Sequence, residues 1–114
     1  MQMTQMLKGI LEGCILKILE EKPNYGYGIL QILNKEGFHD LSESTLYPIL
    51  LRLQKSGQLD FYHESSKLGP KRKYYKITTS GKENLIAFTQ DYKHLNQVVS
   101  QIFKRRLTIK SQAK

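Results

Sequence analysis

The last third of the chain carries apolar residues at alternating steps of three and four, the a/d spacing of a heptad repeat. This apolar seam consists of Leu85, Phe88, Tyr92, Leu95, Val99 and Ile102. It predicts one long helix over residues 80–106, about 37 Å from Ser80 to Lys104 at 1.5 Å per residue. A chain of 114 residues is one domain by length, with too little surface to cover such a helix. We therefore expect a homodimer, with a helix folded back on its own domain as the alternative.

This long helix is expected to begin at Thr78 or Ser80, either of which can cap it. Ser80 and Glu83 also have capping-box spacing. Residues 107–114 are basic and polar without an apolar period, so we expect a disordered tail there.

The first 79 residues change from a helical to a strand period. Apolar residues recur at helical spacing over residues 3–22, 25–36 and 42–56, with Asn24 and Ser42 as caps and Gly37 and Gly57 as ends. Residues 58–64 and 73–77 then predict two short strands joined by a turn-rich tip at residues 65–72. The expected fold class is mostly α with a small β-hairpin, with residues 1–79 as one unit ahead of the long C-terminal helix.

No residue pattern points to catalysis, so we expect neither an enzyme nor a cofactor. His39, His63 and His94 share no short metal-ligand spacing with each other or with Cys14, and we expect no metal site. A single cysteine excludes an intrachain disulfide. No apolar run reaches the roughly 20 residues that span a membrane. The first residues also lack the features of a signal peptide, and the expected location is cytoplasmic.

Positive charge is concentrated in the second half of the chain. Residues 1–64 hold six basic and eight acidic residues, whereas residues 65–114 hold twelve basic and two acidic ones. Such asymmetry indicates an anionic partner, for which nucleic acid and a membrane surface are the first choices, or else a solubilising surface.

Three helices followed by a basic hairpin form the plan of a winged helix-turn-helix, in which the third helix enters the major groove of double-stranded DNA. Short hydroxyl side chains near the start of that helix suit phosphate contacts. The alternative is a protein-interaction module whose hairpin docks on an acidic protein. The residues expected to contact DNA are Ser42, Ser44, Thr45, Tyr47, Pro48, Arg52 and Lys55 in the third helix, and Lys67, Gly69, Pro70, Lys71, Arg72, Lys73 and Tyr75 in the hairpin.

Several strings of the chain resemble the PadR family of bacterial transcriptional regulators, from about Leu7 to Phe88. They include Tyr25-Gly26-Tyr27-Gly28-Ile29, Thr45-Leu46-Tyr47-Pro48, Gly69-Pro70-Lys71-Arg72-Lys73-Tyr74-Tyr75 and Thr78-Thr79-Ser80-Gly81. The resemblance implies a dimeric winged-helix repressor whose third helix reads a palindromic operator. With a single C-terminal helix, the chain is similar to the short members of the family.

The resemblance also implies that the first and last helices build the dimer interface. The residues expected there are Leu7, Leu11, Cys14, Leu85, Phe88, Tyr92, Leu95, Val99 and Ile102. Some short members bind flat aromatic drugs between the subunits, against a tryptophan of the last helix. This chain has no tryptophan, and Tyr92 falls at or near that position. The residues expected around a small aromatic ligand are Tyr92, Cys14 and Ile15, with Tyr92 as a packed residue of the seam as the alternative.

Overall fold

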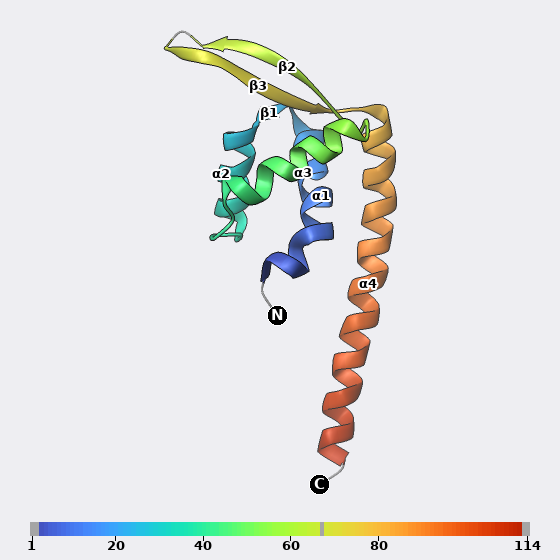
Figure 1. Cartoon of the computed structure of the whole chain (residues 1–114). Coiled ribbons are helices and arrows are strands. Elements are labelled where there is room, and N and C mark those ends of the chain that lie inside the picture. Colours follow the sequence, from blue (N-terminus) through green and yellow to red (C-terminus); the bar gives the residue numbers. More distant parts are fainter. Residues whose placement is uncertain (1–2, 67, 113–114) are drawn as a thin grey trace.

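The computed structural model describes residues 3–66 and 68–112, with side chains for 7–65 and 68–105. Three helices and a short strand precede a hairpin, and one long helix follows it (Figure 1). The elements are α1 (Met3–Glu21), β1 (Asn24–Tyr25), α2 (Gly26–Glu36), α3 (Glu43–Lys55), β2 (Leu59–Ser66), β3 (Gly69–Ile77) and α4 (Thr79–Gln112).

The sheet has three antiparallel strands in the order β1-β3-β2. Leu59 pairs with Ile77 at the base of the β2–β3 hairpin, and Glu64 pairs with Arg72 near its tip. The hairpin is therefore longer than the sequence predicted, because Gly69–Arg72 belong to β3 and not to the turn. β1 was not predicted at all. Its two residues are too few to show a strand period, and it forms because Tyr25 lies beside Tyr74 on the free edge of β3.

The core lies between the three short helices and the inner face of the sheet. α1 contributes Leu11, Ile15 and Leu19, which are at most 2% exposed. Every remaining helix and both hairpin strands also contribute buried side chains, among them Ile29 and Leu33, Leu46, Leu50 and Leu53, Leu59 and Tyr75, and Leu85. Burial of these apolar groups supplies most of the free energy that holds the unit together.

The ends of α2 and α3 confirm two of the predicted stops. Gly37 has φ +139° and Gly57 has φ +82°, conformations that favour glycine because it has no Cβ. The start of α2 differs from the prediction, since Tyr25 and not Asn24 is the N-cap residue. The Asn24 side chain instead accepts a hydrogen bond from the N–H of Tyr25 at 2.9 Å.

α4 begins at the end of the sheet, passes α1 and extends well beyond the other helices (Figure 1). Thr78 caps it, because its Oγ1 accepts a hydrogen bond from the N–H of Gly81 at 3.0 Å, so Ser80 already lies inside the helix. α4 continues to Gln112, and the tail expected at residues 107–114 is helical as far as the structure describes it. No proline or glycine after Gly81 interrupts it. The division of the chain into 1–79, 80–106 and 107–114 stays a prediction.

Candidate nucleic-acid interface

α3 presents a polar and aromatic face to solvent opposite the leucines that anchor it. Leu46, Ile49, Leu50 and Leu53 are buried. The predicted contact residues Ser42, Ser44, Tyr47, Pro48 and Lys55 are exposed on the other side, and Thr45 is half-buried. Leu51, 45% exposed, completes this face. α3 is thus available for insertion into a groove without disturbing the core.

Hydroxyl groups gather at the N-terminus of α3. The Oγ atoms of Ser42 and Ser44 lie 2.8 Å apart, and that of Ser42 lies 3.4 Å from Thr45 Oγ1. Ser42 occupies the N-cap position, but its side chain makes no capping bond to the helix. These hydroxyls therefore lie beside the positive end of the helix dipole, an arrangement that suits a phosphate oxygen.

Tyr47 lies against the start of α2, and Gly26 makes this contact possible. A Cβ at position 26 would overlap the Tyr47 ring. The ring can therefore pack here only because the Tyr-Gly-Tyr-Gly string has a glycine at this position. Partial burial, together with Glu43 and Tyr75, raises the pKa of Tyr47. Its hydroxyl is accordingly protonated at neutral pH and able to donate a hydrogen bond.

A cleft of about 320 Å³ separates α3 from the hairpin. Its lining brings together four of the predicted contact residues from distant parts of the chain, Tyr47 of α3 with Arg72, Lys73 and Tyr75 of β3. Tyr25 and Gly26 complete the lining. Tyr47 and the cationic strand thus face the same opening, where an anionic backbone would meet both.

The basic side chains of the hairpin have different surroundings. Lys71 and Arg72 are exposed, and the Arg72 guanidinium lies 4.6 Å above the Tyr25 ring. Lys73 is half-buried, donates a hydrogen bond to Gln54 Oε1 at 2.9 Å, and lies 4.3 Å from the Phe61 ring centroid. Gly69 and Pro70 are exposed in β3, and Lys67 lies outside the described residues.

Two further predicted contact residues, besides Lys73, have internal surroundings that the sequence did not reveal. Tyr75 is 6% exposed and belongs to the core, so its assignment to the DNA surface is wrong. Tyr74, its neighbour, is the half-buried member of the pair and stacks on Tyr62 with ring centroids 5.6 Å apart. The Arg52 guanidinium pairs with Glu12 of α1, with an Nε–Oε1 distance of 2.7 Å. The positive charge of Arg52 is thus already compensated within the chain.

The predicted dimer residues separate into a buried and an exposed group. Leu11 and Leu85 are 1% and 4% exposed, and Leu7 is also buried, so these three belong to the chain's own core and offer no surface to a partner. The apolar spacing of α1 and α4 does not distinguish residues that pack within the chain from residues that face a partner. These three are buried because the first turns of α4 lie on α1. Tyr92, Leu95, Val99 and Ile102 are between 41% and 55% exposed. Phe88 and Cys14 are half-buried.

An open apolar groove of about 510 Å³ lies between α1, α2 and α4. Cys14, Phe88 and Tyr92 line it, and the two aromatic rings stack with centroids 6.0 Å apart. Ile15, predicted beside them, is 0% exposed and does not reach the groove. Gly13 lies there instead, and a Cβ on it would overlap the Phe88 ring. Partial burial raises the pKa of the Cys14 thiol, which disfavours the reactive thiolate.

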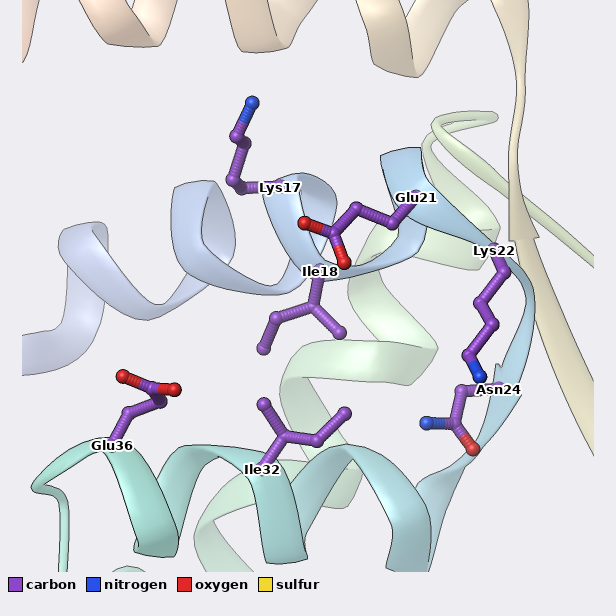
Figure 2. Close-up of a pocket in the computed structure, with 7 residues that line it drawn as sticks. All are labelled: Lys17, Ile18, Glu21, Lys22, Asn24, Ile32 and Glu36. Carbon is purple, nitrogen blue, oxygen red and sulfur yellow. The ribbon is translucent and has the colours of Figure 1, made fainter.

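A smaller hollow of about 210 Å³ lies between α1 and α2 (Figure 2). Ile18 and Ile32 approach each other across it, with charged side chains at the rim: Lys17 and Glu21 of α1, Lys22 just after it, and Glu36 of α2. Among the described residues, no group of three histidine, cysteine, aspartate or glutamate side chains is placed to hold a metal ion. None of the helices in the described part of the chain is long and apolar enough to cross a membrane.

Three helices, a basic hairpin and an exposed third helix define a winged helix-turn-helix DNA-binding protein. The profile of the transcriptional regulator PadR-like family matches residues 15–87. The chain belongs to this family and is a DNA-binding regulator of transcription, not an enzyme. The family assignment also favours DNA binding over the alternative of a protein-interaction module.

Solved structures agree with this assignment. A PadR-like transcriptional regulator from Bacillus cereus is 46% identical, with a TM-score of 0.78 over 87% of this chain and 96% of that one. A transcriptional regulator from Streptococcus is 38% identical, with a TM-score of 0.78 over 86% and 96%. A PadR-like transcription factor from Bacteroides fragilis is 40% identical, with a TM-score of 0.74 over 86% and 94%.

Proposed function

We propose that this PadR-like regulator works as a homodimer that binds a palindromic operator and represses transcription. The observation that carries the proposal is the exposed apolar face of α4. Tyr92, Leu95, Val99 and Ile102 keep the heptad spacing on a helix whose side chains are all exposed from Thr89 to Arg105. An apolar strip of this kind is typical of a helix that pairs with another helix, and a second copy supplies one.

Two contact regions on each subunit would hold the DNA. The exposed face of α3, with Ser42, Ser44, Thr45, Tyr47, Pro48 and Lys55, is proposed to enter the major groove. Lys71 and Arg72, together with Lys67, Gly69 and Pro70, are proposed to hold the flanking backbone. Phosphate contacts of this kind supply affinity, and base contacts from α3 supply specificity. Arg52, Lys73 and Tyr75 are left out because Arg52 pairs with Glu12, Lys73 donates to Gln54, and Tyr75 is buried in the core.

Repression follows from occupancy of the operator, which requires no contact beyond the DNA. A regulator of transcription works where the chromosome lies, so the proposed location is cytoplasmic. We extend the proposal to release by a small aromatic ligand in the groove beside Cys14 and Tyr92. Its volume of about 510 Å³ and its stacked rings suit a planar apolar compound. The ligand would release DNA by favouring a dimer in which the two α3 helices have a different spacing.

Selection of preferred duplexes from a random pool tests the proposed function. We expect enrichment of an inverted repeat whose half-sites lie about one helical turn apart, because two α3 helices related by a two-fold axis read the same sequence in opposite directions. Enrichment of a single unrepeated site would contradict the dimer. The absence of any enrichment at low salt would contradict sequence-specific binding.

A further inference from the structure

The direction in which α4 leaves the rest of the chain is set close to its first residue. Leu85 is buried and Phe88 is half-buried, but every side chain from Thr89 to Arg105 is exposed. Within the described part of the chain, α4 is therefore anchored by its first three turns, and the portion that carries Leu95 and Val99 projects freely (Figure 1).

The Thr78 hydroxyl joins three segments at this anchor. Its Oγ1 lies 2.7 Å from the carbonyl oxygen of Gly57 and 3.1 Å from that of Gln58, and its proton is shared between these two acceptors. The same oxygen accepts the N–H of Gly81 at 3.0 Å. The N–H of Thr78 also donates to the Gln58 carbonyl at 3.1 Å. One residue thus ties the end of α3 to the end of β3 and the start of α4.

Two glycines allow the three segments to approach this closely. Gly57 has φ +82°, which turns the chain after α3 and directs its carbonyl toward Thr78. A Cβ on Gly81 would overlap the backbone carbonyl of Gln58 and crowd Ile77. Because one of these neighbours is backbone, an alanine at position 81 would push α4 away from the end of α3.

A small change at this anchor is amplified along α4. Val99 is 20 residues beyond Thr79, about 30 Å at 1.5 Å per residue. A rotation of about 5° at Thr78 would therefore move Val99 by about 2.6 Å, close to the 3.4 Å rise of one base pair. Since α3 ends in the same cluster, its position relative to the seam depends on this angle.

We propose that Thr78 and Gly81 are positioning residues that set the distance between the two α3 helices of the dimer, and hence the half-site spacing of the operator. This inference rests on the proposed function, because it requires a dimer joined through α4. Neither residue belongs to the proposed DNA contacts. Their effect is expected on the spacing between half-sites and not on the sequence of each half-site.

The test measures binding to inverted repeats of the wild-type half-site whose spacers differ by one base pair. Thr78→Val removes the hydroxyl at nearly constant shape, and Thr78→Ser is the matched control that keeps it. Gly81→Ala tests the second residue and carries the test if Thr78→Val does not fold. Thermal unfolding and affinity for a single half-site report whether the DNA-binding unit is intact.

We expect wild-type protein and Thr78→Ser to prefer one spacer, and all folded variants to bind a single half-site equally well. In Thr78→Val, the preference for that spacer over its neighbours should fall about five-fold, the order of one net hydrogen bond. The preference should also fall in Gly81→Ala, because the added Cβ overlaps the Gln58 carbonyl. A folded variant that keeps the wild-type spacer preference overturns this inference but leaves the proposed function standing. Wild-type protein that shows no preference for inverted repeats overturns the proposed function, and this inference with it.

Discussion

Removing the two exposed charges of β3 should lower DNA affinity by the same factor for every sequence and reduce its dependence on salt. Lys71 and Arg72 are exposed at the hairpin, next to the cleft that Tyr47 lines. Each phosphate contact contributes about −0.9 to the slope of log K against log salt for duplex DNA. The double variant Lys71→Ala with Arg72→Ala should therefore have a slope shallower by about 1.8 per subunit.

Fluorescence anisotropy with a labelled duplex, repeated between about 50 and 200 mM salt, measures this slope. The matched control is Lys22→Ala with Lys35→Ala, which removes the same charge from exposed positions near the ends of α1 and α2. The control should change the slope by much less, because neither lysine belongs to the hairpin or to α3. An unchanged slope in the hairpin variant, with an unchanged fold, would refute the proposed role of β3 in phosphate binding.

Lys73 gives this prediction a sharper form. From the sequence alone, Lys71, Arg72 and Lys73 form one basic run and predict three equivalent phosphate contacts. Lys73 instead donates to Gln54 and lies over the Phe61 ring. Adding Lys73→Ala to the double variant should therefore lower the melting temperature and leave the salt slope nearly unchanged. A further change of about 0.9 in the slope would show that Lys73 leaves Gln54 to bind phosphate.

Three further predictions concern α1 and α4. Leu95→Asp with Val99→Asp places like charges in the proposed interface and should raise the dimer dissociation constant at least about 100-fold in sedimentation equilibrium; an unchanged constant contradicts the interface. Gly13→Ala should lower the melting temperature because its Cβ overlaps the Phe88 ring of α4. Gly9→Ala, which has open space around its Cβ, should raise the melting temperature. Equal shifts of the two variants contradict the contact between Gly13 and Phe88. Tyr92→Ala should weaken binding of a planar dye about three- to ten-fold by anisotropy, and undiminished binding contradicts a site in the groove.

Local sequence patterns predicted most of the helices because each pattern has a local physical cause. The leucines of α3 recur at helical spacing, and Gly57 ends the helix with a positive φ that other residues adopt at a cost. β1 escaped prediction because two residues form a strand only when an edge such as that of β3 is available. The end of α4 was missed because polar, basic residues are compatible with either a helix or a tail.

Pairings over long sequence distances explain the errors at the candidate site. Glu12 and Arg52 are 40 residues apart, and no local pattern links them. Tyr74 and Tyr75 alternate across the sheet, and the sequence indicates only that one of them is buried. The heptad positions likewise predicted an apolar face for α4. They did not predict that the first part of this face is buried within the chain and the later part is exposed. Leu85 lies in the chain's own core and Leu95 is exposed, because α1 covers only the first turns of the helix.

The mass of the complex between this protein and a duplex carrying one selected operator tests the central proposal most directly. Native mass spectrometry at low protein concentration counts the chains on each duplex. A homodimer on a palindrome predicts two chains per duplex, with the one-chain complex nearly absent even when DNA is in excess. A one-chain complex that dominates under those conditions would contradict the proposal that α4 joins two subunits before they bind DNA.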